Sequence, residues 1–450
     1  MKRAMILLVL LPALLLSGSV YAAARVNSTR DAACFSPVVL TGDPELCEGV
    51  TIRAYTSFSD SRGLNRLYHE LSLDAASGED SCVFSLNEPI WDTQPEQPDW
   101  SDRLVPQIAS GLYPNDLRSS ERVLPEHMQY VADKTPAGGE YEEAVRLADF
   151  YETWPFYCAV LGDYPEARAE ELNEVLRTTL ARPVPEDATQ TVEIKKRADG
   201  SVRGYGTSGG SGGLSLICDC YGNFYLFTLR SSGSEDAEDR TEFWLMDLRW
   251  SEEDGLYVPD TASLRLLAEC VGRSYMYYAP DGGALLVESG PDSSLLTRVT
   301  PAGELAEAYT IPRPEGTYSI RIETGEGWVL LADTLDGVYA FDYSGGALVE
   351  GPFFDIGGVP GYELLSRPAG EYRYTLEDIY EYDGERLALF LDFAPSDEDE
   401  PAQDYYRWQV QNSDAFLICA DALGNVCVQQ LPSSLQTEPA EQISYTLEMR

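Results

Sequence analysis

Residues 214–229 read LSLICDCYGNFYLFTL. An apolar run is followed by the turn residues Gly222 and Asn223 and then by a second apolar run with three aromatic side chains. A tight turn needs a residue that accepts a positive φ, which glycine does freely and asparagine tolerates. The stretch therefore predicts an antiparallel β-hairpin.

The same pattern recurs along the C-terminal part of the chain. Each such hairpin is followed by a second one, so that four short strands form a unit. The turn glycines of the first hairpins are 60, 45 and 57 residues apart. A four-stranded unit repeated at this period is the sequence signature of a β-propeller. The first hairpins are predicted at 214–229, 273–288, 318–332 and 378–393, and the second at 243–258, 294–310, 337–349 and 415–430.

Two of these runs resemble a known group of proteins. The run DCYGNFY at 219–225 and the run VYAFD at 338–342, ahead of Gly345, are similar to the loose repeats of the NHL and PQQ-type β-propeller families. The resemblance extends over roughly residues 191–450. It implies a propeller fold and no particular activity, because many propellers share these motifs.

Two predicted elements remain at the ends of this region, a hairpin at Thr191–Gly204 and a strand at Ile443–Glu448. We expect them to pair and close the ring, because closure removes exposed strand edges. The predicted fold class is therefore mainly β, a β-propeller of about four to six four-stranded blades. A stack of β-sandwiches with similar hairpins is the alternative, since hairpin spacing alone does not prove closure.

The residues before this region have a different pattern. Two amphipathic helices are expected at Glu140–Trp154 and Pro165–Ala181, because apolar residues recur there at spacings of three and four. Glu70–Leu73 and Ser81–Leu86 predict a further hairpin. The predicted domains are a signal peptide at 1–24, a mixed N-terminal region with two short helices at 25–185, and a propeller-like domain at 186–450.

The first residues have the features of a targeting segment. Lys2 and Arg3 precede an apolar run at Ala4–Leu16, and Val20-Tyr21-Ala22 fits the −3 and −1 positions of a signal-peptidase site. We therefore expect an exported protein, either secreted or associated with the cell envelope. The alternative is an uncleaved N-terminal membrane anchor, which residues 4–24 are just long enough to form.

The net charge and the small number of histidines argue against several classes of partner and of catalytic chemistry. The chain has 450 residues, with 75 Asp and Glu against 32 Lys and Arg and a net charge of −43. Such a surface repels nucleic acid and anionic membrane surfaces, so neither is expected as a partner. His69 and His127 are the only histidines, which is too few for most nucleophilic or metal chemistry. We interpret both as surface or satisfied structural residues, and the catalytic residues stay unknown.

Nine cysteines in an exported chain predict disulfide bonds. Cys419 and Cys427 flank a predicted hairpin turn, so we expect them to face each other on neighbouring strands. Cys34 and Cys47 lie on either side of a short loop that a bond would close. The candidate disulfide residues are therefore these four.

No cofactor is predicted from the residues. Gly204–Gly209 matches the G-x-G-x-x-G pattern, but no predicted helix follows it to hold a pyrophosphate, so we interpret it as a connector. Cys218 and Cys220 share one face of a predicted strand, and no second motif completes a tetrahedral metal site. Acidic turns offer oxygen ligands for Ca²⁺ without the spacing of an EF-hand, so Ca²⁺ stays an open alternative.

The lack of catalytic motifs favours binding over catalysis. The leading hypothesis is an exported, non-enzymatic β-propeller that binds a protein or glycan ligand at the cell envelope. The alternative is a secreted glycoside-active enzyme that uses a carboxylate pair near the propeller axis. A membrane-tethered sensor domain is a third hypothesis if the N-terminal segment stays attached.

Overall fold

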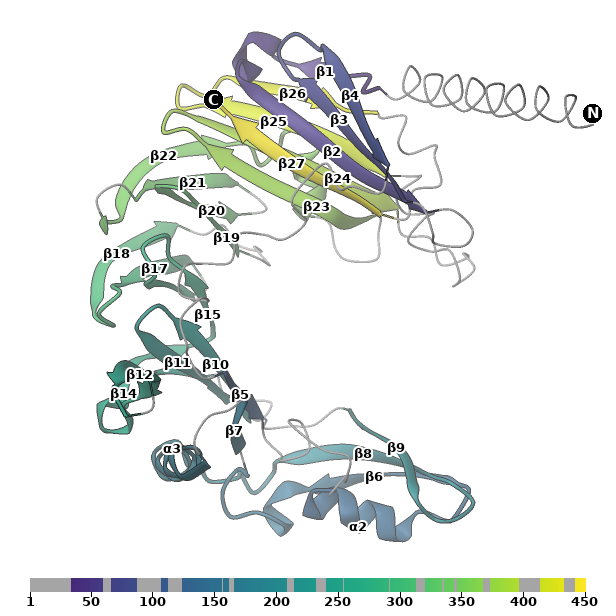
Figure 1. Cartoon of the computed structure of the whole chain (residues 1–450), viewed down its shortest axis with the longest axis vertical. Helices are drawn as coiled ribbons and strands as arrows, with labels where there is room; N and C mark the ends of the chain where they lie inside the picture. The colour runs from purple at the N-terminus through teal and green to yellow at the C-terminus, as the bar shows by residue number, and fades with distance from the viewer. Residues whose placement is uncertain are drawn as a thin grey trace, which may run out of the picture. The chain divides into compact units, whose positions relative to one another are not determined.

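The computed structural model divides the chain into two compact units. Unit 1 comprises Met1–Pro95 with Gly316–Arg450, and unit 2 comprises Glu96–Glu315. Figure 1 shows that both are built mainly from antiparallel β-sheets. The described residues are 34–59, 66–86, 107–111, 124–155, 157–161, 166–208, 214–231, 240–253, 255–290, 292–312, 320–333, 336–343, 346–366, 373–395, 413–432 and 442–450.

Unit 1 contains three sheets built on four antiparallel strands each. The four strands follow one another in the sequence in two of these sheets, whereas the third joins the last strand of the chain to three strands near its beginning. The first is β19 (Ile320–Gly325), β20 (Trp328–Asp333), β21 (Gly337–Asp342) and β22 (Val349–Asp355). The second is β23 (Arg373–Tyr382), β24 (Arg386–Pro395), β25 (Asp414–Asp421) and β26 (Val426–Gln430), extended by β1 (Val38–Thr41). The third is β27 (Gln442–Met449), β2 (Val50–Ser59), β3 (Arg66–Asp74) and β4 (Asp80–Leu86).

The third sheet combines the two ends of the chain. β27 pairs with β2, with Ile52 opposite Leu447, and β3–β4 is the hairpin predicted near residue 70. Ile443, Tyr445 and Leu447 are buried, because alternate residues of a strand point to the same face. The expected pairing of Ile443–Glu448 with Thr191–Gly204 is therefore wrong. The C-terminal strand β27 pairs with β2 of the N-terminal segment instead.

The β23–β26 sheet lies between two hydrophobic cores. Phe390 of β24 packs in the first core, core A, where its ring centroid lies 4.5 Å from that of Tyr445 in β27. Leu389 and Leu391 point to the other face and pack in core B with Trp328 of β20. Both faces of this sheet are therefore buried, one against the β27–β4 sheet and the other against the β19–β22 sheet.

Unit 2 contains two more sheets of this type. The hairpin predicted at 214–229 is confirmed, with Tyr221 opposite Phe224. The first sheet is β10 (Leu214–Tyr221), β11 (Phe224–Ser231), β12 (Arg240–Ser251), β13 (Leu256–Pro259) and β14 (Arg265–Val271), where β12 pairs with both β13 and β14. The second is β15 (Arg273–Tyr278), β16 (Ala284–Ser289), β17 (Ser293–Val299) and β18 (Leu305–Pro312).

The predicted fold class is confirmed. Each of the eight predicted hairpins corresponds to a pair of neighbouring strands, and the described residues form five blade-type sheets. Gly327 and Gly384 have φ of +85° and +99°, as the turns require. Gly222 is needed for a close approach instead, because a Cβ there would lie 3.1 Å from the carbonyl oxygen of Gly282. Gly345 lies outside the described residues.

The rest of unit 2 combines small sheets with two helices. The predicted helix at Pro165–Ala181 is confirmed as α3 (Glu166–Thr179). A second helix that the sequence analysis missed, α2 (Glu126–Lys134), follows Pro125 and has its acid in the first turn and its lysine in the last. The sheets are β6 (Glu140–Arg146), β8 (Thr189–Lys196) and β9 (Val202–Ser208), and the pair β5 (Gln107–Gly111) and β7 (Tyr157–Leu161).

The predicted helix at Glu140–Trp154 is wrong. Its first half is strand β6, which pairs with β8 from Glu140 opposite Lys195 to Arg146 opposite Thr189, and a short 3-10 helix follows at Leu147–Asp149. Pairing with a distant strand overrides the helix-like spacing of apolar residues. This pairing crosses the predicted boundary between 185 and 186, and the predicted division into domains stays a prediction.

Two other expectations concern segments at the limits of the structure. The first residues of Gly204–Gly209 lie in β9 rather than in a connector, because they pair with β8, and 209–213 lie outside the described residues. Among the residues that the structure describes, no helix is both long and apolar enough to cross a membrane. The predicted signal peptide at 1–24 lies outside the described residues, so export stays a prediction.

The shared sheet of the two chain ends leads to a first prediction. Leu71 of β3 is fully buried in core A, whereas Val83 of the neighbouring strand β4 is 52 % exposed. We expect Leu71→Ala to lower the free energy of unfolding by about 2–5 kcal/mol, because it leaves a cavity in the core. Val83→Ala is the control and should cost less than about 1 kcal/mol. Equal losses for the two variants in urea denaturation would contradict this placement of the N-terminal strands.

Candidate binding site on the edge strands of unit 1

Strands β19, β23 and β27 each form an edge of their own sheet, and β23 contacts both of the others. Tyr380 and Tyr382 of β23 point toward core B, whereas Ile379 packs against core A. Side chains of β23 at odd positions from Glu377 therefore face the β27–β4 sheet. Those at even positions face the β19–β22 sheet.

Four carboxyl groups lie on these strands or directly behind them. We call them the acidic edge: Glu323 of β19, Glu377 and Glu381 of β23, and Asp392 of β24. Burial raises the pKa of all four carboxyl groups above its ordinary value, and raises that of Asp392 to about 6. Desolvation penalises the charged form, so each group holds its proton to a higher pH than in water.

Two members of the acidic edge form a cross-strand pair. Glu377 lies directly opposite Asp392 in the β23–β24 register, which places their Cβ atoms about 5 Å apart. Asp392 is only 3 % exposed, and its Oδ1 has no hydrogen-bond partner in the structure. The hydroxyl of Ser413 donates to the same carboxyl group and partly offsets its raised pKa. Nearby Glu377 and Asp414 raise this pKa further.

The cations of this region are engaged with other acids. Arg321 of β19 forms an ion pair with Asp378 of β23, which links two neighbouring sheets. Arg53 of β2 lies 2.7 Å from Oε1 of Glu448 and 3.6 Å from Oε1 of Glu70. Among the described residues, no ion pair reaches any of the four acidic-edge carboxyl groups. The acidic edge therefore has unbalanced carboxylate charge once its protons are lost.

The acidic edge can accept hydrogen bonds from a ligand and can attract a cationic group. Among the described residues, no group of three or more His, Cys, Asp or Glu is placed to hold a metal ion. Ca²⁺ binding by the acidic turns stays a prediction. The sequence analysis missed the acidic edge, because nothing in the local pattern separates these four from the other acids.

The predicted disulfide residues lie in unit 1. Cys419 and Cys427 lie directly opposite each other on β25 and β26, as predicted, and both are buried thiols. Cys47 is also a buried thiol and ends the short 3-10 helix Pro44–Cys47, while Cys34 lies just before β1. The bonds Cys419–Cys427 and Cys34–Cys47 stay predictions.

The histidines occupy buried structural positions. His127 of α2 is fully buried, and its Nδ1 and Nε2 each lie 2.9 Å from a partner, the hydroxyl of Tyr151 and Oε1 of Gln190. This confirms the interpretation of His127 as a satisfied structural residue. His69 of β3 is 1 % exposed, and burial lowers its pKa to about 4. Cys218 and Cys220 share a face of β10, as predicted, and pack against the core of unit 2.

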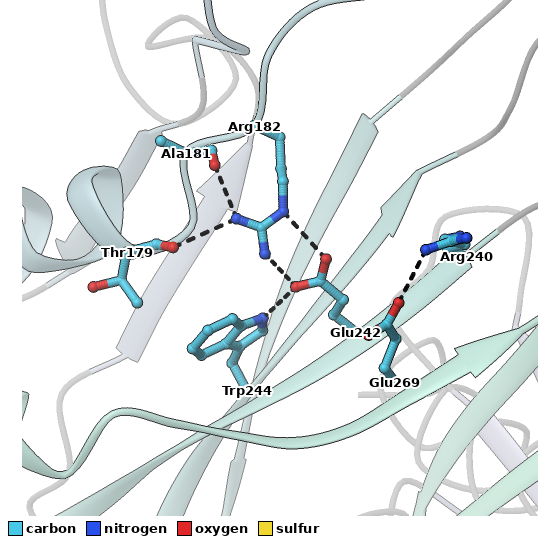
Figure 2. Close-up of polar contacts among 7 residues, drawn as sticks. All are labelled: Thr179, Ala181, Arg182, Arg240, Glu242, Trp244 and Glu269. Atoms are coloured by element: carbon cyan, nitrogen blue, oxygen red, sulfur yellow. Dashed lines mark hydrogen bonds and ion pairs between the residues drawn. The ribbon is translucent and has the colours of Figure 1, made fainter.

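Unit 2 contains a polar cluster of its own, which Figure 2 shows. The guanidinium of Arg182 pairs with the carboxylate of Glu242 through two hydrogen bonds, one of them 3.1 Å from Nε to Oε1. The indole Nε1 of Trp244 donates to Glu242 Oε2 at 2.7 Å, and Arg182 Nη1 donates to the carbonyl oxygen of Ala181 at 2.8 Å. These contacts tie the end of α3 to β12. We interpret the cluster as structural, because its charges satisfy one another.

The raised pKa of Asp392 gives a prediction with a definite sign. Its folded pKa of about 6 lies above its ordinary 3.8, so its contribution to stability is complete below pH 3.8 and is lost as pH rises through 6. Asp392→Asn keeps the shape and removes the charge. We expect this variant to raise the free energy of unfolding by about 1–3 kcal/mol at pH 8 and to leave it nearly unchanged at pH 3.5.

Urea denaturation at the two pH values tests this prediction. Asp421→Asn is the control with the opposite sign, because hydrogen bonds from Asn425 and the turn lower the pKa of Asp421. It should destabilise the protein at pH 8. An effect of Asp392→Asn that is the same at both pH values would show that the burial of charge is not its cause.

The polar cluster of unit 2 contains a matched pair for a second test (Figure 2). The side chains of Arg182 and Glu242 are 29 % and 21 % exposed, whereas those of Arg240 and Glu269 are 64 % and 48 % exposed. We expect Glu242→Gln to lower the free energy of unfolding by about 1–3 kcal/mol, because two charge-assisted contacts are weakened. Glu269→Gln should cost less than about 0.5 kcal/mol. Thermal and urea unfolding of the two variants measure these losses. A larger loss for Glu269→Gln than for Glu242→Gln would contradict the prediction.

Comparison with known proteins gives only distant similarities. No protein-family model matches the chain, and no curated protein matches it. It is similar to an apocarotenoid oxygenase mutant from Synechocystis, with 10 % identity over 92 % of this chain and 96 % of that chain and a TM-score of 0.25. It is also similar to a periplasmic gluconolactonase from Pseudomonas aeruginosa, with 13 % identity over 88 % and 99 % of the chains and a TM-score of 0.23. A quinoprotein alcohol dehydrogenase-like protein from Bacteroides thetaiotaomicron has 10 % identity over 91 % and 94 % and a TM-score of 0.22.

Proposed function

We propose that the chain is an exported, non-enzymatic binding module that uses the acidic edge to bind a basic protein segment at the cell envelope. The observation that carries this proposal is the set of partly buried carboxyl groups at Glu323, Glu377 and Glu381. No ion pair among the described residues reaches them, although the charge of Arg321 acts on Glu323. Export rests on the N-terminal signal pattern of residues 1–24.

A cationic ligand fits these groups for a physical reason. A carboxylate that has lost part of its water gains more from a Lys or Arg partner than a fully solvated one does. Glu377 and Glu381 lie on the same face of β23 four residues apart, so a single extended basic segment can contact both. The net charge of −43 adds long-range attraction to a basic partner and repels acidic ones.

A second candidate function rests on the Glu377–Asp392 pair. Two neighbouring carboxyl groups in different environments are the arrangement that glycosidases use as acid and nucleophile. The raised pKa of Asp392 suits a general acid near pH 6. Its 3 % exposure places it behind Glu377 rather than at a surface that a sugar reaches, so binding is the conclusion and hydrolysis the alternative.

The binding proposal is tested with a fluorescent lysine-rich peptide as the probe. We expect the double variant Glu377→Gln/Glu381→Gln to weaken binding at least tenfold, about 1.4 kcal/mol, and to reduce the salt dependence of the affinity. Glu326→Gln is the matched control, because Glu326 is an exposed acid in the turn between β19 and β20. It should change the affinity less than about twofold.

Two results would count against the proposal. Equal weakening by the control and the double variant would show that only net charge attracts the peptide. Release of reducing sugar from an oligosaccharide panel, lost in Glu377→Gln, would favour the glycoside-active alternative. N-terminal sequencing of the mature protein tests export separately, since a start beyond residue 22 indicates cleavage.

A further inference from the structure

Three buried thiols meet at one place in unit 1. Cys47 ends the 3-10 helix that leads into β2, Cys419 lies in β25 and Cys427 lies in β26. All three are 0 % exposed and belong to core A. Cys47 precedes Cys419 by 372 residues and Cys427 by 380 residues. Its place beside them is therefore a result of the fold rather than of local spacing.

Cys47 lies beside both of the other members of this trio. The 3-10 helix that it ends contacts β25 and β26, and its side chain packs in core A with Cys419 and Cys427. The side-chain Nε2 of Gln429 lies 3.6 Å from Cys47 Sγ and donates to the carbonyl oxygen of Ala75 at 2.8 Å. This amide holds the Cys47 thiol beside the two strand cysteines.

We propose that Cys47 forms a disulfide bond with one of the two strand cysteines, Cys419 or Cys427, and that the third cysteine stays a thiol. The bond differs from both pairings that the sequence predicts. It joins the lead-in of the β27–β4 sheet to the β23–β26 sheet, across core A. A bond needs Cα atoms about 4.4–6.8 Å apart, and the contacts of the 3-10 helix with β25 and β26 bring Cys47 close to both candidates.

The chemistry requires an oxidant of the disulfide class, such as glutathione disulfide. One cysteine thiolate attacks the donor and displaces one of its thiols, which leaves a mixed disulfide. The second cysteine thiolate attacks this mixed disulfide, forms the protein bond and displaces the other donor thiol. The two protein thiols lose two protons and two electrons in total, and the donor is reduced to two thiols.

Burial decides when this reaction takes place. The neighbouring Cys419 and desolvation raise the pKa of Cys47, and the neighbouring Cys47 and desolvation raise that of Cys427. In the folded protein almost none of either is therefore the reactive thiolate. We expect the bond to form while the chain folds and then to resist exchange. The inference rests on the proposed export, because an oxidising compartment is where such bonds persist.

Peptide mapping of the full chain refolded in a buffer of reduced and oxidised glutathione tests the pairing directly. Free thiols are first alkylated, and the unreduced protein is then cut with trypsin and with a protease that cleaves before Asp. Asp43 separates Cys34 from Cys47, and Asp421 separates Cys419 from Cys427, so each of the four lies on its own peptide.

We expect a linked pair containing the Cys47 peptide and either the 414–420 or the 421–450 peptide. A linkage of Cys47 to Cys34, a linkage of Cys419 to Cys427, or full alkylation of Cys47 would each overturn the proposal. The purified chain is oxidised in the tube, so this result does not depend on whether the protein is exported. Export is judged from the mature N-terminus, and the failures of the two proposals are thereby distinguishable.

A stability measurement adds a second readout. Reduction of the refolded wild-type protein should lower its Tm by at least about 5 °C, because the bond closes a very long loop of the unfolded chain. Cys47→Ala should remove this difference between oxidised and reduced protein. Cys270→Ala, which replaces a buried cysteine of unit 2, should keep it. A Tm that does not respond to reduction in the wild type would contradict the proposal even if Cys47→Ala fails to fold.

Discussion

The pairing of β27 with β2 is the contact on which unit 1 depends. It brings the last strand of the chain into a sheet with three strands from near its beginning. Ile443, Tyr445 and Leu447 thereby reach core A, where they meet Phe390 of the neighbouring sheet. Without this pairing, one face of the β23–β26 sheet would have no cover, and the acidic edge would lose the strand that borders it.

Burial of both faces of the β23–β26 sheet has an electrostatic consequence. A central strand such as β24 contains apolar residues at nearly every position, and Asp392 is the exception near its end. The same packing that excludes water from Phe390 and Leu391 also excludes it from this carboxyl group. The raised pKa of Asp392 and its unpartnered oxygen are therefore consequences of its place in the sheet. Its 3 % exposure keeps Asp392 out of a ligand's reach, so the binding proposal rests on Glu323, Glu377 and Glu381.

The sequence predicts the hairpins of this protein well because their signals are local. An apolar run, a glycine turn and a second run lie within about sixteen residues, and β10–β11 and β23–β24 form as expected. Glu140–Trp154 shows the limit of this approach. Its apolar spacing fits a helix, but β8 lies about fifty residues further along and offers a strand to pair with. The partner of β27 cannot be predicted from local sequence for the same reason, since it lies almost four hundred residues away.

The candidate site is harder to predict than the fold, because its residue type is common. Among 75 acids, only the register of β23 against β24 places Glu377 opposite Asp392. The thiol cluster contains one contact that a local signal predicts and one that depends on distant parts of the chain. The eight-residue spacing of Cys419 and Cys427 is a local signal, and the structure places them opposite each other as expected. The arrival of Cys47 beside them depends on the union of the chain ends, because Cys47 directly precedes the strand that pairs with β27. The thiol cluster therefore depends on contacts between distant parts of the chain, whereas the Glu377–Asp392 pair of the acidic edge is set by the local β23–β24 hairpin.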